Sequence, residues 1–103
     1  MKYDITQKGE ICHVSLDGQL NFAAHQDFHA LLLAVIAAKA KKVVFEMSHV
    51  TGIDSVGIGL LYIAQEDVAK SGKSLCLASP RDSVARLLEL TEAEKLFEIT
   101  DLG

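Results

Sequence analysis

The sequence predicts an α/β fold, bordering on α+β, built around a mixed sheet of four or five strands with parallel central strands. Two observations favour it. Hydrophobic residues alternate with the period of a strand in some segments and recur with the 3.6-residue period of a helix in others, in the order β-β-α-β-α-β-α. Strand-helix-strand units of this length favour right-handed parallel crossovers, so the central strands should be parallel with helices packed against them.

The N-terminal segment predicts two short strands, Tyr3 to Thr6 and Glu10 to Asp17, joined by a tight turn at Lys8-Gly9. The second strand alternates as a half-buried strand does, and Asp17-Gly18 should end it. Cys12, Val14 and Leu16 fall on one of its faces, and Ile11, His13 and Ser15 on the other.

A helix should follow, with Asn21 as its N-cap and the lysines of residues 39–42 beyond its hydrophobic stripe as a cationic C-terminal end. The stripe consists of Phe28, Leu31, Leu32, Val35 and Ile36. The β-branched and aromatic run Val43 to Met47 then predicts a central strand covered on both faces.

In the second half, a helical segment from Leu60 to Lys70 should stop at Ser71-Gly72. Leu75 to Ala78 predicts a short strand, and Ser79-Pro80 should open a third helix. Residues 91–94 have the spacing of a capping box for a last short turn, and residues 96–99 could close the sheet.

Length and charge restrict the function. At 103 residues the chain should form one domain, residues 1–103. Its net charge of −4 and its scattered Lys and Arg residues give no basic stripe, so we expect no nucleic-acid partner. The N-terminus has no apolar signal region, and the stretch Ala30 to Ala38 is far shorter than the ~20 residues that span a bilayer. We therefore expect a soluble, cytoplasmic protein without membrane insertion.

The Cys and His residues give little sign of a metal or redox site. Cys12 and Cys76 lie far apart in strand-like runs, which favours reduced core residues. His25 and His29 have i, i+4 spacing but lack the Glu of a His-Glu-x-x-His motif, so a solvated helix edge is favoured over a metal site. His13 should be a partly exposed strand residue. No cofactor is expected.

The segment Gly52 to Gly59 is the best candidate for a functional surface, because it combines three glycines, Asp54 and Ser55 where a strand gives way to a helix. A structural alternative is that Asp54 or Ser55 only caps the helix. Gly57 and Gly59 each cost about 1 kcal/mol of helix propensity, which suggests close approach by a neighbouring helix or a partner.

Catalytic and nucleotide motifs are absent from this segment. It matches neither Gly-x-x-x-x-Gly-Lys-Ser/Thr nor Gly-x-Gly-x-x-Gly. A nucleophile elbow needs glycine two residues before Ser55, where the chain has Ile53, and His49 and Asp54 alone do not define a triad. The protein is therefore predicted not to be an enzyme.

The run from Glu46 to Leu61, with Asp54-Ser55-Val56-Gly57-Ile58-Gly59 at its centre, resembles the signature of STAS domains, particularly bacterial anti-sigma factor antagonists. Leu16 to Leu20 is similar to the family's Leu-x-Gly-x-Leu element, and Ala78 to Leu88 to its last long helix. The likeness covers nearly the whole chain. It implies a STAS-like fold whose helices pack mainly on one face of the sheet.

The resemblance further implies a partner-switching regulator. In this family the serine at the position of Ser55 is phosphorylated by a cognate anti-sigma factor that is also a serine kinase. A PP2C-type phosphatase removes the phosphate, and only the unmodified form binds the anti-sigma factor. The implied partner-binding residues are Asp54, Ser55, Val56, Gly57, Ile58 and Asn21.

Two positions depart from the family pattern: Val56 replaces a frequent second Ser or Thr, and Gly52 replaces a frequent aromatic. Ser55 is thus the sole acceptor in the core motif. One alternative is a STAS subunit of a phospholipid-trafficking ABC transporter, which binds its ATPase subunit without phosphorylation. Another is binding of a nucleotide or other small ligand at the same segment. Weak self-association also stays open.

Overall fold

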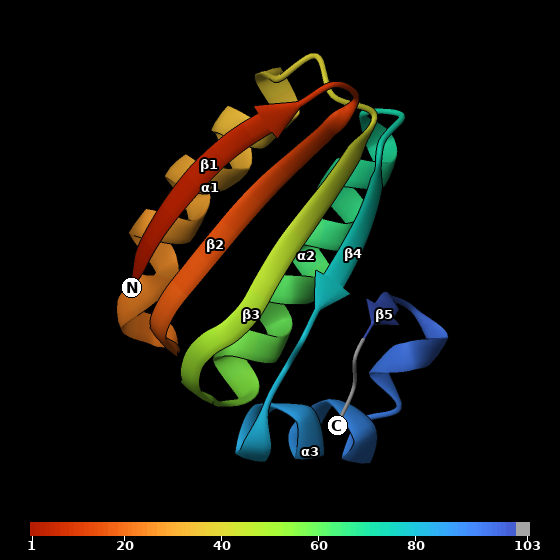
Figure 1. Cartoon of the computed structure of the whole chain (residues 1–103). Helices are drawn as coiled ribbons and strands as arrows, with labels where there is room; N and C mark the ends of the chain where they lie inside the picture. Colours follow the sequence, from red (N-terminus) through yellow and green to blue (C-terminus); the bar gives the residue numbers. More distant parts are fainter. Residues whose placement is uncertain (101–103) are drawn as a thin grey trace.

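The computed structural model describes residues 1–100, and Figure 1 shows the arrangement of its elements. The strands are β1 (Lys2–Lys8), β2 (Ile11–Leu20), β3 (Lys42–Ile53), β4 (Ser74–Ala78) and β5 (Glu98–Thr100). The α-helices are α1 (His25–Ala37), α2 (Ser55–Lys70) and α3 (Asp82–Leu90), and two short 3₁₀ helices are η1 (Phe22–Ala24) and η2 (Ala93–Lys95).

The five strands form one mixed sheet in the order β1-β2-β3-β4-β5. β1 and β2 are an antiparallel hairpin, and every later neighbour pair is parallel. This confirms the predicted STAS-like α/β fold with parallel central strands. The crossovers through α1 and α2 bring β2, β3 and β4 side by side because each helix returns the chain to the same end of the sheet.

The long helices α1 and α2 lie on the same face of the sheet (Figure 1), as expected. Buried and more exposed residues alternate along β2 and β3, so one face is covered and the other largely open. The expectation that Val43 to Met47 is covered on both faces is therefore wrong. Val43, Phe45 and Met47 are buried under the helices, whereas the side chains between them, Val44 and Glu46, are only half-buried.

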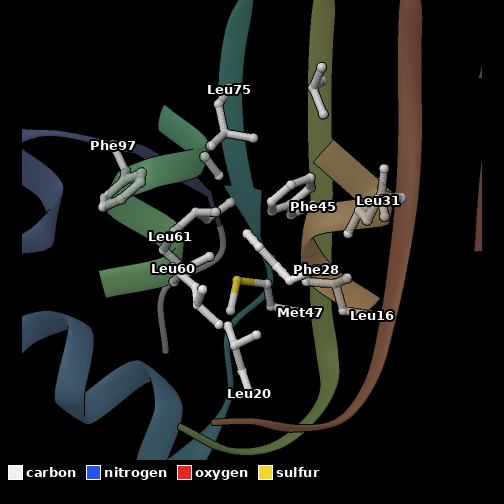
Figure 2. Packing of buried hydrophobic residues seen from close by; sticks show 14 of the residues in the cluster. Leu16, Leu20, Phe28, Leu31, Phe45, Met47, Leu60, Leu61, Leu75 and Phe97 are labelled. Carbon is white, nitrogen blue, oxygen red and sulfur yellow. The ribbon is translucent and has the colours of Figure 1, made fainter. Parts of the chain in front are cut away.

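Figure 2 shows the core between the sheet and the helices, where Phe28 from α1 and Leu61 from α2 meet Phe45 and Met47 from β3. The rings of Phe28 and Phe45 pack edge to face with centroids 5.9 Å apart. Phe97, just before β5, stacks on Tyr62 of α2 at 5.5 Å and thereby holds the C-terminal segment against the helix layer.

β2 does not end at Asp17-Gly18 as predicted but continues to Leu20. Gly18 has a φ of +105°, and the pairing with β3 shifts register on either side of Asp17-Gly18. These irregularities are β-bulges, which bend a strand without ending it. The partner strand β3 is long enough to keep Leu20 paired with Ile53.

The predicted helix after Asn21 begins with a 3₁₀ turn. Asn21 caps η1 by accepting a hydrogen bond from the Ala23 N–H, and α1 starts only at His25. α1 ends at Ala37, before the cationic residues 39–42, so no lysine lies in its last turn. Instead, Lys73 Nζ donates to the carbonyls of Ala38 and Ala40, at 2.7 and 2.6 Å.

The C-terminal expectations need smaller corrections. α3 begins at Asp82, two residues after Pro80, and β5 is the predicted closing strand shifted to residues 98–100. The capping box at residues 91–94 is wrong, because the Thr91 hydroxyl donates back to the Leu87 and Leu88 carbonyls at the end of α3. Glu92 takes a left-handed conformation with a φ of 55° and makes no side-chain cap of η2.

Cys12 and Cys76 are buried and unpaired, as predicted for core residues. His13, His25 and His29 are exposed, which agrees with a solvated strand face and helix edge. Among residues 1–100, no helix combines the length and the apolar character needed to cross a bilayer.

Candidate functional site

The candidate segment is a direct junction between a strand and a helix. β3 continues through Gly52 to Ile53, and α2 starts at Ser55, so Asp54 alone connects the two elements. From the sequence, β3 was expected to stop at Met47 with a glycine-rich loop at residues 52–57 before a helix from Leu60, and both the loop and that helix start are wrong. The strand could extend because Gly52 and Ile53 pair with Gln19 and Leu20 of the prolonged β2.

Asp54 is the N-cap of α2. Its backbone is extended, and its Oδ1 accepts a hydrogen bond of 2.9 Å from the Gly57 N–H. The capping role weighed from the sequence is thus present, and it is filled by Asp54 and not by Ser55. Ser55, the first helical residue, is exposed to solvent. Its hydroxyl makes no hydrogen bond within residues 1–100, so it remains available to an outside group.

Gly57 allows the first turn of α2 to pack closely on the sheet. A Cβ atom at residue 57 would overlap the Leu20 carbonyl oxygen and would lie 2.8 Å from Ile53 Cγ1. The first turn of α2 thus packs directly on the end of β2, which requires glycine. At Gly59 a Cβ atom would have no neighbour within 4 Å, so no neighbouring helix explains this glycine, and approach by a partner stays a prediction.

Asn21 lies beside Asp54, although 32 intervening residues separate them in sequence. Both residues line a shallow pocket of about 230 Å³ together with Gln19, Gly52 and Ile53. Asn21 is held there by two hydrogen bonds, since its Oδ1 accepts from the Ala23 N–H at 3.0 Å and its Nδ2 donates to Gln19 Oε1 at 3.1 Å. Sequence reasoning did not single out Gln19.

The predicted partner-binding residues divide into two groups. Asp54, Ser55 and Val56 are exposed, and Asn21 is half-buried. Gly57 and Ile58 are buried, so they support the surface from beneath.

Phe22 adds an apolar group that sequence reasoning missed. Its side chain is 74% exposed, whereas that of Val56 is 39% exposed. η1, which carries Phe22, contacts α2. The available signal was an aromatic residue directly after the Asn21 cap and outside the helical stripe. Aromatic residues are enriched where proteins bind one another, so Phe22 adds apolar area of a suitable kind beside the junction.

The junction presents a solvent-exposed hydroxyl beside a capping carboxylate. The described hydrogen bonds and ion pairs place no base on the Ser55 hydroxyl, which a nucleophilic serine would need. Within the same part of the chain, no group of three His, Cys, Asp or Glu residues could hold a metal ion. The two thiols lie elsewhere, and burial raises the pKa of Cys12 and of Cys76 above the ordinary value of 9.0, which keeps them protonated.

Comparison with known sequences identifies similar proteins. The family model described as STAS domain matches residues 2–101. A STAS-domain containing protein of Pseudomonas aeruginosa is 26% identical over 92 residues, which span 89% of this chain and 90% of that protein. A candidate anti-sigma factor antagonist of Thermotoga maritima is 32% identical over 60 residues, which span 58% of this chain and 53% of that protein.

Solved structures share the fold. The crystal structure of a candidate anti-sigma factor antagonist from Thermotoga maritima has a TM-score of 0.86 at 22% identity, covering 96% of this chain and 86% of that one. The anti-sigma factor antagonist SpoIIAA in its unphosphorylated form has a TM-score of 0.69 at 14% identity, covering 96% and 86%. At these identities the likeness establishes the fold alone.

Proposed function

The chain belongs to the STAS domain family, and on that premise we propose that it is an anti-sigma factor antagonist that switches partners when Ser55 is phosphorylated. A cognate anti-sigma factor with serine kinase activity modifies Ser55, and a PP2C-type phosphatase reverses the modification. The unmodified form binds the anti-sigma factor. The protein acts by binding and not as an enzyme.

The hydroxyl of Ser55 at the start of α2, exposed and without a hydrogen bond to any residue of the described range 1–100, is the observation that carries this proposal. A kinase must reach its acceptor. The Asp54 cap and the close packing of Gly57 on β2 fix the position of Ser55, and neither contact uses the Ser55 hydroxyl oxygen. Val56 in the same turn and Phe22 on η1 supply exposed apolar area for a protein partner. Related folds include the phosphorylated form of the cell fate determinant SpoIIAA.

Electrostatics favours a switch in docking over a switch in folding. A phosphate on Ser55 adds about −1.5 to −2 charge beside Asp54, but the helix N-terminus attracts negative charge and partly offsets the repulsion. The fold should therefore persist. A partner that fits the neutral hydroxyl would have to accommodate and desolvate this group, and a mismatch of about 3 kcal/mol weakens binding roughly a hundredfold.

The direct test mixes the purified chain with ATP and a kinase-like anti-sigma factor from the same genome, and locates any added phosphate by mass spectrometry. We expect one phosphate, on Ser55, and none on the Ser55→Ala variant. Ser71, exposed at the other end of α2, serves as the matched control, because its replacement by Ala should leave phosphorylation unchanged.

Binding provides the second readout. Ser55→Ala should bind the partner as the unmodified chain does, and Ser55→Asp should bind much more weakly. Equal affinity of the two variants would contradict the proposed switch. Tight binding to a transporter ATPase subunit that is insensitive to Ser55→Asp would instead favour the transporter function.

A further inference from the structure

β1 is an unprotected edge of the sheet. Within residues 1–100 it pairs only with β2, and all seven of its residues are exposed. An edge strand presents unpaired N–H and C=O groups that can pair with another strand. β5, at the opposite edge, has only three residues and offers a much shorter edge.

The two faces of β1 differ in chemistry. Its register with β2 places Lys2, Asp4, Thr6 and Lys8 opposite Asp17, Ser15, His13 and Ile11, on the open face of the sheet. Tyr3, Ile5 and Gln7 pair with Leu16, Val14 and Cys12, on the helix-covered face. All the charges of β1 thus lie on the open face.

A second copy of the chain could extend this sheet through an antiparallel β1–β1 pair around a twofold axis. The helices of both copies lie on the same side of the joined sheet only if each open-face residue of one β1 pairs with an open-face residue of the other β1. In such a register one residue lies on the twofold axis and faces its equivalent in the other copy. Three registers of this kind pair five or more residues of each strand, and their central residues are Asp4, Ile5 and Thr6. The register centred on Tyr3 would overlap only three residues.

Charge distinguishes the three registers. In the register centred on Ile5, Lys2 of one copy faces Lys8 of the other. In the register centred on Asp4, the Asp4 carboxylates of the two copies face each other. Centring on Thr6 sets Asp4 against Lys8 of the second copy, twice by symmetry. Opposite charges directly across a strand pair attract, and like charges repel. We propose that the chain forms a homodimer by antiparallel pairing of β1 with β1 of a second copy, centred on Thr6.

The helix above this edge can accommodate the dimer. Figure 1 shows α1 behind β1, and the N-terminal ammonium of Met1 lies 3.8 Å from the Asp27 carboxylate of α1. Ala30 and Ala34 follow Asp27 at i+3 and i+7 on the same flank, and both are exposed. Pairing the two edges would bring the α1 helices side by side, and small side chains allow such an approach.

Ser55 lies at the end of β3, away from the middle of β1, so the dimer leaves both acceptor sites free. Antiparallel pairing sends the two Ser55-bearing ends in opposite directions along the joined sheet. The dimer would therefore present two separate docking surfaces. Phosphorylation of Ser55 and dimerisation should then be independent of one another.

Sedimentation equilibrium across a wide concentration range tests the charge register. Wild type should show a reversible monomer–dimer equilibrium. Asp4→Lys should weaken the dimer about tenfold, because two symmetric attractions become repulsions and no other register relieves them. Lys8→Asp alone should instead move the pairing to the register centred on Ile5, where residue 8 faces Lys2 of the second copy. The double variant Asp4→Lys/Lys8→Asp should restore wild-type affinity. Far-UV circular dichroism of each variant controls for folding.

Disulfide trapping tests the geometry. Directly opposed residues of an antiparallel pair have Cα atoms about 4.5 to 5.5 Å apart, a distance that a disulfide can bridge. Thr6→Cys should therefore cross-link rapidly between copies on oxidation. His13→Cys, exposed on the same face but one strand inward, should not. The native Cys12 and Cys76 are buried and should not interfere.

The proposal is overturned if wild type remains monomeric at every concentration, or if the charge-swapped double variant dimerises no better than Asp4→Lys. Cross-linking at Ile5→Cys but not at Thr6→Cys would overturn the register. Loss of the dimer in Ser55→Ala would show that the contact lies at the α2 end of the molecule and not at β1.

Discussion

The carbonyl oxygen of Leu20 occupies the space that a side chain at Gly57 would need. Two segments separated by 36 residues of intervening chain are thereby locked together, with the end of β2 against the first turn of α2. This contact fixes where α2 begins. It consequently fixes where the Ser55 hydroxyl is presented, although Ser55 takes no part in it.

Gly57→Ala should destabilise the fold by about 1 to 3 kcal/mol, because the overlap with backbone outweighs the gain of about 1 kcal/mol in helix propensity. Gly59→Ala is the matched control, two residues further along the same helix and with open space around its Cβ position. It should stabilise by about 0.5 to 1 kcal/mol. Urea unfolding of both variants measures the difference. A change of the same sign in the free energy of unfolding of both variants would contradict a close contact between Gly57 and the Leu20 carbonyl.

Asp54→Ala should lower the free energy of unfolding by about 0.5 to 2 kcal/mol, since the Gly57 N–H loses its acceptor. Asp54→Asn keeps an oxygen for the cap and should restore most of that loss. Thermal unfolding of the two variants separates capping from charge. Equal losses would mean that the carboxylate charge, and not the hydrogen bond, stabilises the helix start.

A negative charge added at the N-terminus of α2 and one added at its C-terminus should have different effects on the stability of the fold. Ser55→Asp places it at the N-terminus, where the helix dipole contributes about 0.3 to 1 kcal/mol in its favour, so stability should be retained despite Asp54. Ser71→Asp places it at the C-terminus and removes the hydrogen bond from Ser71 Oγ to the Asp67 carbonyl, 3.0 Å long. Chemical denaturation should therefore find Ser71→Asp the less stable variant. Unfolding of Ser55→Asp would instead make the switch one of folding.

Lys73→Met should destabilise by about 1 to 3 kcal/mol, because the Ala38 and Ala40 carbonyls lose the ammonium group that joins the end of α1 to the start of β4. Lys70→Met is the control. In the described part of the chain its ammonium forms one exposed ion pair, with Glu66, so its loss should change stability little. Differential scanning calorimetry would detect the contrast, and equal melting temperatures would argue against a structural role for Lys73.

Stability should fall as the pH rises above about 9. Burial raises the pKa of the Cys12 and Cys76 thiols above 9.0 in the folded state, so the unfolded chain loses these protons first and is favoured by alkali. The stabilisation is complete below the unfolded pKa and is lost as the pH approaches the folded pKa. Unfolding between pH 8 and pH 11 would show the decline, and it should be shallower in a Cys12→Ala/Cys76→Ala variant. Identical slopes would assign the decline to other groups.

Local patterns predicted the element types well and their limits poorly. The alternation of Cys12, Val14 and Leu16 located β2, but Asp17-Gly18 was interpreted as its end because an Asp-Gly dipeptide commonly marks a turn. It is a bulge here, since β3 continues the pairing past it. The same misreading shortened β3 and turned a one-residue junction at Asp54 into a loop.

The candidate site was predicted in part. The Asp54-Ser55 pair stood out by composition and by its resemblance to a family signature. Asn21 was carried over from that resemblance, and its place beside Asp54 in a shared pocket follows from the pairing of β2 with β3. Phe22 was not predicted, because the exposure of a single aromatic residue produces no periodic pattern in the sequence.

The sequence by itself determined the order of strands and helices, the buried stripe of α1 and the position of Ser55 directly after Asp54 near a helix start, because these depend on side-chain period and on chemistry between near neighbours. Only the tertiary structure decided which glycine is indispensable, which face of the sheet stays open and that Ser55 is exposed. Those properties depend on contacts between distant segments, such as Leu20 against Gly57, and no local pattern records them.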